Sequence, residues 1–282
     1  MAASSAGHGP PPAPEPLPQP VVDNHAHLDI VRADGVGLDI PDALAAAAAV
    51  GVDRIVHIGC DLESAEAAVV IAHRYAAIVA GVALHPNEAP ALAARGELGA
   101  AYARIEELAG DDRVRVVGET GLDYFRTGPD GVGAQHDSFR WHIDLAKRLG
   151  KTLQIHDRDS HADVLRILDE EGAPARTVMH CFSGDADFAK ECLDRGFFLS
   201  FAGTLTFKNA TALRAAAAIT PLERLLVETD APYLTPHPWR GAVNASYLLP
   251  LTVRALAGAR GVALDELVGA LSANAQELYG PW

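Results

Sequence analysis

Short apolar runs rich in Val, Ile and Leu alternate with longer amphipathic stretches along this chain. Eight such runs occur, at residues 21–22, 54–59, 78–84, 114–118, 152–155, 177–179, 197–201 and 225–227. Within the runs the apolar positions are mostly continuous and do not alternate with polar ones, as in parallel strands that are buried on both faces. The pattern therefore predicts eight buried parallel strands.

Between and after these runs, apolar residues recur at helical spacing. The amphipathic stretches are residues 62–75, 135–149, 162–171, 187–195, 211–218, 248–261 and 264–279. Strands that alternate with helices are typical of α/β folds, and eight strands are the number that a closed barrel requires. We therefore predict a single-domain α/β protein, a (β/α)8 TIM barrel, since barrels of this length form one domain.

An open, doubly wound sheet is the alternative α/β architecture. That fold commonly carries a glycine-rich phosphate-binding turn after its first strand. Here the first run leads into Asp23-Asn24-His25-Ala26-His27, which contains no glycine. The sequence therefore favours the barrel.

Residues 1–20 differ in composition from the rest of the chain. They are mainly Ala, Ser, Gly and Pro, with seven prolines between Pro10 and Pro20. The segment lacks the basic start and the apolar stretch of a secretory signal, and it has few residues that could join a core. We predict a disordered, Pro-rich tail over residues 1–20 and the barrel domain over residues 21–282.

Charge and cysteine content limit the function classes. The formal net charge of −14 argues against a protein that coats nucleic acid, although a nuclease whose bound cations supply local positive charge is not excluded. Cys60, Cys181 and Cys192 show no paired spacing, which predicts buried free thiols. No apolar run approaches the roughly 20 residues of a membrane span. The sequence thus predicts a cytoplasmic protein without a membrane anchor.

Six residues of metal-ligating type stand at the ends of five predicted strands. They are His25, His27, Glu119, His156, His180 and Asp230. All six can gather at the C-terminal mouth of a barrel, where active sites of this fold lie. Neutral imidazole is a common Zn²⁺ ligand, and a carboxylate buried in an apolar barrel needs a cation or a hydrogen-bond partner. The alternative for each carboxylate is an ion pair with Arg115, Arg126 or Arg158.

The number of candidate ligands bears on the number of metal ions. Four histidines and two carboxylates exceed the three protein ligands of a typical mononuclear catalytic zinc site and suit two divalent ions. Zn²⁺, Mn²⁺ and Mg²⁺ are all compatible with mixed imidazole and carboxylate ligands. Such a pair can make water nucleophilic near neutral pH and neutralise substrate oxygens.

Five segments resemble, in the same order, the motifs of the TatD family of metal-dependent deoxyribonucleases, which are amidohydrolase-like TIM barrels. These segments are residues 23–28, 118–124, 154–158, 180–184 and 228–234, and the resemblance extends from about residue 21 to residue 280. It implies hydrolysis of DNA phosphodiester bonds, with single strands degraded from the 3′ end.

The resemblance also implies a role for each ligand. It assigns His25, His27 and Asp230 to one metal, His156 and His180 to the other, and Glu119 to a bridge between them. It further implies that Asp230 serves as the general base.

Two loops depart from the family pattern. Asn87 in Ala83-Leu84-His85-Pro86-Asn87 stands where the family commonly has a histidine, and Ala245-Ser246 replaces part of an Asn-Glu-Pro motif. Both loops would contact substrate, so the departures bear on substrate choice and not on the six ligands.

Several other polar residues are candidates for roles at the mouth. His85 could bind a phosphate oxygen or protonate a leaving group, or it could be a hydrogen-bonded rim residue. Arg158 could hold a phosphate or pair with Asp157 or Asp159. Asp123 could orient a ligand or cap a turn.

The remaining basic residues and histidines are interpreted by position. A basic collar is predicted around the mouth from Arg126, Arg158, Lys208 and Arg240. His57 is interpreted as a core residue, and the histidines in helical stretches are interpreted as surface residues: His73, His136, His142 and His161.

Two rival functions remain open. An amidohydrolase acting on a small cyclic amide or lactone would use the same attack by activated water, and fold does not choose between carbonyl and phosphoryl centres. A catalytically silent metal-binding scaffold, with the Pro-rich tail as its recruitment segment, is the rival from another class. The presence of all six ligands argues against the scaffold.

Overall fold

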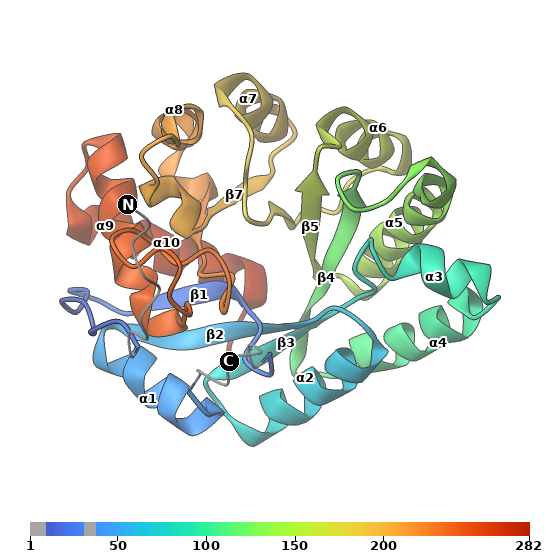
Figure 1. Ribbon diagram of the computed structural model, residues 1–282, viewed down its shortest axis with the longest axis horizontal. Coiled ribbons are helices and arrows are strands. Elements are labelled where there is room, and N and C mark those ends of the chain that lie inside the picture. The colour runs from blue at the N-terminus through green and yellow to red at the C-terminus, as the bar shows by residue number, and fades with distance from the viewer. Residues whose placement is uncertain (1–9, 31–37) are drawn as a thin grey trace, which may run out of the picture.

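The computed structural model describes residues 10–30 and 38–282. Eight strands form one parallel sheet in the order β1 to β8, with helices around it (Figure 1). The strands are β1 Val21–Ala26, β2 Val52–Gly59, β3 Ile78–Val82, β4 Val114–Asp123, β5 Thr152–Arg158, β6 Thr177–Met179, β7 Phe198–Phe201 and β8 Leu225–Val227. The predicted (β/α)8 barrel is confirmed.

Ten α-helices and three short 3-10 helices connect the strands in the described part of the chain. The helices are α1 Ile40–Ala49, α2 Leu62–Arg74, α3 Ala89–Ala94, α4 Leu98–Ala109, α5 Pro129–Leu149, α6 His161–Glu171, α7 Ala186–Asp194, α8 Thr211–Ile219, α9 Leu249–Arg260, α10 Leu264–Tyr279, and the 3-10 turns η1 Gly203–Thr206, η2 Leu222–Arg224 and η3 Ser246–Leu248. Helix α5 begins at Pro129 and not at Gln135 as predicted, because proline is well suited to the first turn of a helix. None of these helices combines the length and hydropathy that crossing a bilayer requires.

Apolar side chains fill the interior of the barrel away from the mouth. The inner cluster contains Val22, Val56, Ile58, Val79, Val116, Val178, Phe198 and Leu226, with Leu278 and Tyr279 from the end of α10. The hydroxyl of Thr152, at the start of β5, donates to the carbonyl of Leu278 at 2.7 Å. The last helix therefore closes the N-terminal end of the barrel, and the opposite end is left for polar residues.

The seam between β8 and β1 is closed by hydrogen bonds that involve side chains. The carboxylate of Asp23 accepts from the amide of Thr229 at 2.8 Å and from its hydroxyl at 2.6 Å. Further along, the amide of Asp230 donates to the carbonyl of His25 at 2.9 Å. The first and last strands are thus joined beside two of the predicted metal ligands.

Residues 10–20 pack against the barrel, which departs from the predicted disorder of this part of the tail. Leu17 is buried in the main apolar cluster. The hydroxyl of Tyr247 donates to the carbonyl of Pro11 at 2.7 Å. Proline lacks an amide donor but keeps its carbonyl acceptor, so donors on the barrel can hold this segment. The rest of the predicted tail, residues 1–9, lies outside the described residues.

Candidate metal centre

The six predicted ligands converge at the C-terminal mouth of the barrel. His25 lies in β1, and His27 is the first residue after that strand. Glu119 lies in β4 and His156 in β5, and the loops after β6 and β8 supply His180 and Asp230. Strands β1, β4 and β5 run further than predicted, so three of these residues lie within a strand and not after it. A strand position fixes the backbone of a site residue more firmly than a loop does.

Glu119 lies between two groups of histidines. Its Oε1 is 3.7 Å from Nε2 of both His25 and His27. Its Oε2 is 3.1 Å from Nδ1 of His156 and 3.1 Å from Nε2 of His180. Ligand atoms that share one ion at about 2.1 Å stand roughly 3–4 Å apart. One carboxylate therefore faces two candidate cation positions.

Asp230 completes the first of these groups. Its Oδ1 is 3.6 Å from Nε2 of His27 and 3.9 Å from Nε2 of His25, and the two imidazole nitrogens are 3.3 Å apart. The backbone of Asp230 has a φ of 54°, in the left-handed region that Asp tolerates better than most residues. The hydrogen bond from its backbone amide to the carbonyl of His25 in β1 holds this conformation in place.

In the centre, burial shifts the pKa values of the carboxylates and imidazoles in one direction, and the neighbouring opposite charges shift them in the other. Burial raises the pKa of Glu119, but the charge of His180 and the hydrogen bonds from His156 and His180 bring it well below its usual value. Burial lowers the pKa of His27, but Asp230 and Glu119 raise it to about 9. Without a cation, carboxylates and imidazoles stabilise one another by sharing protons. A metal ion entering the centre would displace those protons.

Two of the histidines are oriented by oxygen atoms of uncharged groups that contact the ring nitrogen facing away from the centre. Nδ1 of His25 lies 2.9 Å from Oε1 of Gln154, and Nδ1 of His27 lies 3.0 Å from the carbonyl of Ile58. Each contact fixes the ring with Nε2 directed at the centre, which is how metal-binding histidines are usually held.

A third histidine, His180, is contacted by a buried carboxylate. Oε1 of Glu228 is 2.8 Å from Nδ1 of His180 and accepts the amide of Cys181 at 2.8 Å. Neither Glu228 nor Gln154 was predicted from the sequence as a site residue. The available signal was that Gln154 lies within a predicted strand run and Glu228 directly follows another.

His156 is held differently, by a chain of polar residues. Its Nε2 lies 3.3 Å from Oδ2 of Asp123. Asp123 in turn accepts from the side chain of Asn87 at 3.2 Å and from the amide of Arg126 at 2.9 Å. Asp123 therefore both orients His156 and caps the turn after β4, and Asn87 supports it from the neighbouring loop.

Gly121 allows β4 and β5 to approach at this level. Its φ is 137°, and a Cβ atom there would lie 2.1 Å from the carbonyl oxygen of His156. Only glycine avoids this collision.

The centre opens into a hollow of about 710 Å³. The guanidinium of Arg158 borders it and stacks over the ring of Phe125 at 3.8 Å. Within residues 10–30 and 38–282, Arg158 forms no salt bridge, whereas Asp157 contacts His161 at 2.6 Å. The guanidinium is thus directed by an aromatic ring, and the ion pair considered for it with Asp157 or Asp159 is not formed there.

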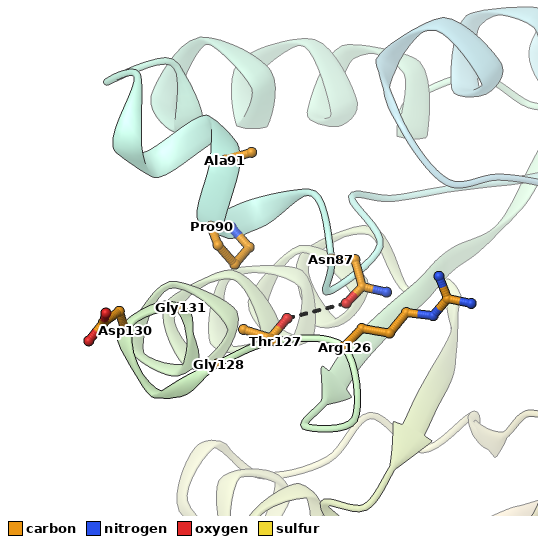
Figure 2. A pocket seen from close by; sticks show the side chains of 8 residues that line it. All are labelled: Asn87, Pro90, Ala91, Arg126, Thr127, Gly128, Asp130 and Gly131. Carbon is orange, nitrogen blue, oxygen red and sulfur yellow. Dashed lines mark hydrogen bonds between the residues drawn. The ribbon is translucent and has the colours of Figure 1, made fainter.

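Figure 2 shows the residues that line a second hollow, of about 520 Å³. It lies between the start of α3 and the start of α5, and Thr127 donates to Oδ1 of Asn87 at 3.3 Å across its floor. Asn87 and Arg126 border both hollows. The two spaces are therefore neighbours at the mouth of the barrel.

The predicted basic collar is divided. Arg126 and Arg158 border the main hollow, but Lys208 and Arg240 are not among its lining residues. Arg240 lies over the ring of Phe207 at 4.4 Å, outside that hollow. The positive charge therefore concentrates on the side of β4 and β5.

Three histidines outside the six also had predicted positions. Nε2 of His85 lies 3.9 Å from Oε2 of Glu119, and burial lowers the pKa of His85 to about 4 although the Glu119 charge opposes this. His142 was predicted on the surface and is wholly buried, because its Nε2 accepts the amide of Leu84 at 3.1 Å. His57 is buried as predicted.

The fold and the cluster define a class, a TIM barrel with candidate metal-ligating residues at its mouth. The family profile described as TatD related DNase matches residues 22–280. The chain belongs to the TatD family of metal-dependent hydrolases.

Relatives and solved structures agree with this placement. The chain is 46% identical over 264 residues to "Uncharacterized metal-dependent hydrolase TatD" of Mycobacterium tuberculosis, covering 92% of this chain and 98% of that protein. It is 36% identical over 259 residues to the metal-dependent hydrolase YabD of Bacillus subtilis, covering 91% and 98%. The crystal structure of YJJV, a TatD homologue from Escherichia coli, superposes with a TM-score of 0.82 at 27% identity, covering 92% and 97%.

Proposed function

We propose that this protein hydrolyses phosphodiester bonds in DNA and removes nucleotides from the 3′ end of single strands. The observation that carries the proposal is the position of Glu119, whose two oxygens face separate pairs of imidazoles beneath an open hollow bordered by arginine and aromatic side chains.

The donor set suits two divalent cations. In the proposed assignment one is held by His25, His27 and Asp230, the other by His156 and His180, and both by Glu119. The fit rests on donor spacing: the distances among His25, His27 and Asp230 match ligands that share an ion, and Oε2 of Glu119 lies 3.1 Å from a nitrogen of both His156 and His180. Bound there, such ions would supply positive charge for phosphoryl oxygens and lower the pKa of water.

Asp230 is the carboxylate best placed to take a proton from an attacking water. Its side chain is 15% exposed, against 6% for Glu119, and it borders the hollow. We assign it the role of general base. His85 stays neutral at pH 7 because of its low pKa, so its contribution is a hydrogen bond to a substrate oxygen and not a charge.

The surroundings of the hollow suit a flexible polyanion. Arg126 and Arg158 supply positive charge for phosphates, while Phe125 and Tyr233 are 63% and 47% exposed and offer ring faces. Bases stack on such faces only when they are unpaired, which favours single strands. The neighbouring hollow offers space for the part of the strand that is not being cleaved.

Digestion of single-stranded oligonucleotides labelled at either end, with Zn²⁺, Mn²⁺ and Mg²⁺ in turn, tests this proposal. The expected result is stepwise shortening from the 3′ end that stops with chelator, slower cleavage of duplex, and no attack on a blocked 3′ end. Internal cleavage would contradict the exonuclease mode. Hydrolysis of cyclic amides or lactones without any action on DNA would favour the small-substrate amidohydrolase.

A further inference from the structure

Cys60 places a thiol in contact with the candidate metal ligands. Its Sγ donates to Oε1 of Glu119 at 3.3 Å and lies 3.8 Å from Nδ1 of His27. One ligand-type atom from each of these three residues lies within 4.8 Å of the others. Cys60 follows β2, a strand that supplies none of the six predicted ligands. The centre therefore contains a seventh donor that the sequence analysis interpreted only as a buried thiol.

The backbone of Cys60 is fixed on both sides. Its amide donates to the hydroxyl of Ser64 at 2.9 Å, and its carbonyl accepts the amide of His85 at 2.8 Å. The thiol also borders the main hollow, so an ion that enters through the mouth can reach it. A cysteine that serves only as a small apolar residue packs among apolar groups. Cys60 packs against the inner apolar cluster on one side, but the polar contacts of its sulfur are with a carboxylate and an imidazole.

The position of the thiol selects one of the two candidate cation positions. Sγ contacts Oε1 of Glu119, the oxygen that faces His25 and His27, and not Oε2, which faces the other pair of histidines. We propose that Cys60 is a further ligand at the position formed by His25, His27 and Asp230, and that it makes this position selective for thiophilic divalent ions such as Zn²⁺ over Mn²⁺ and Mg²⁺. The inference rests on the proposed metal centre.

The chemistry of this ligation is an exchange of a proton for a cation. The S–H bond breaks, the proton leaves to solvent, and a sulfur–metal bond forms, with no change of oxidation state. Thiolate is a soft ligand and strengthens binding of Zn²⁺, Cd²⁺ and Co²⁺ far more than binding of Mn²⁺ or Mg²⁺. Coordination to such an ion is sufficient to deprotonate a thiol.

Cys181 is a matched control because it borders the same hollow. It is next to His180 in the chain, yet within the described residues its sulfur makes no hydrogen bond to a candidate ligand. A thiol effect that is specific to Cys60 should therefore persist when Cys181 is replaced.

The experiment loads Co²⁺ into the metal-free full-length protein and records its absorption spectrum. Visible bands report that the ion is bound, and a near-ultraviolet charge-transfer band reports a thiolate ligand. We expect both in the wild type and in Cys181→Ala, and only the visible bands in Cys60→Ala and Cys60→Ser. In competition titrations Cys60→Ala should weaken Zn²⁺ and Cd²⁺ binding by about tenfold or more, and Mn²⁺ binding by less than about threefold.

Three outcomes overturn the inference, and they are distinguishable from one another. Visible bands without a charge-transfer band in the wild type would show that the ion is bound without sulfur. A charge-transfer band that persists in both Cys60 variants would assign the thiolate to another residue. Absence of any Co²⁺ binding would remove the proposed metal centre itself, and Cys60 ligation with it.

Discussion

Oε1 of Glu228 lies 2.8 Å from Nδ1 of His180, and the two side chains are 0% and 5% exposed. A carboxylate in this position fixes the ring orientation and makes the opposite nitrogen a better metal donor. We therefore expect metal affinity to depend on Glu228, although Glu228 is not itself one of the proposed ligands.

Glu228→Gln preserves the shape of the side chain and removes its charge. We expect metal affinity to fall about 10–100-fold, measured by titration of the metal-free protein, with a circular dichroism spectrum like that of the wild type. Glu223→Gln is the matched control, since Glu223 is exposed on η2. Unchanged affinity in Glu228→Gln would mean that Glu228 serves only to hold the amide of Cys181.

Glu119→Gln tests the bridge. The amide has one acceptor oxygen where the carboxylate has two, so it cannot serve both groups of histidines. Bound metal should fall from two ions towards one and most activity should be lost, as measured by elemental analysis and oligonucleotide digestion of the folded variant. Full metal content in that protein would rule out a bridging role.

Asp230→Asn tests the general base. The variant keeps an oxygen ligand but loses the proton acceptor, so turnover at saturating metal should fall by roughly 10²–10⁴. Metal content measured on the same sample separates loss of the base from loss of the ion. Wild-type turnover would exclude Asp230 from proton transfer.

His142 should make stability depend on pH. Burial lowers its pKa from 6.5 to about 4, although its hydrogen bond to the carbonyl of Ser138 opposes the shift. Above pH 6.5 the ring is neutral in the folded and unfolded chains alike. Between pH 6.5 and pH 4 only the unfolded chain takes up the proton, so the free energy of unfolding should decrease as the pH falls, by at most roughly 3 kcal/mol.

Urea unfolding of the metal-free protein across this pH range measures the effect. His142→Gln should remove this part of the pH dependence, whereas His237→Gln, at an exposed position, should retain it. A decline in His142→Gln as steep as that of the wild type would contradict the assignment.

Arg126 and Arg158 should act together as the phosphate-binding side of the mouth. Replacing both with Ala should weaken binding of single-stranded DNA and make the log–log dependence on salt shallower by about 0.7 for each lost phosphate contact. Hydrolysis of a small phosphodiester should change less. Arg240→Ala, outside the main hollow, is the control, and an equal loss of binding in that variant would argue against this division of the collar.

The barrel and its six converging residues could be predicted because parallel strands buried on both faces leave continuous apolar runs. Strands β1, β4 and β5 were predicted too short, because His25, Glu119 and His156 are polar residues that look like the start of a loop. In the folded protein the pairing of β1 with β2 resumes at Ala26, beyond His25, and the pairing of β4 with β5 resumes at Thr120 and includes His156. Such pairing overrides local propensity and is not visible in one strand's sequence.

Other features could not be predicted because they depend on distant partners. The order of residues 10–20 depends on donors such as Tyr247, 236 positions away from Pro11. The burial of His142 depends on an amide of Leu84, in the loop after β3. Residues 10–20 were predicted to be disordered from their composition, and His142 was predicted to be exposed from its place in a helical stretch. Neither kind of signal takes account of these contacts.

The wide spacing of the proposed metal ligands along the chain has a consequence for biogenesis. His25 and His27 emerge from the ribosome long before Asp230, and the side chains meet only when β8 has joined β1. Contacts between such distant residues form late and slowly in folding. Binding of an ion at the proposed position of His25, His27 and Asp230 must therefore follow closure of the barrel, and an ion that binds only the closed form would stabilise newly completed chains against reopening.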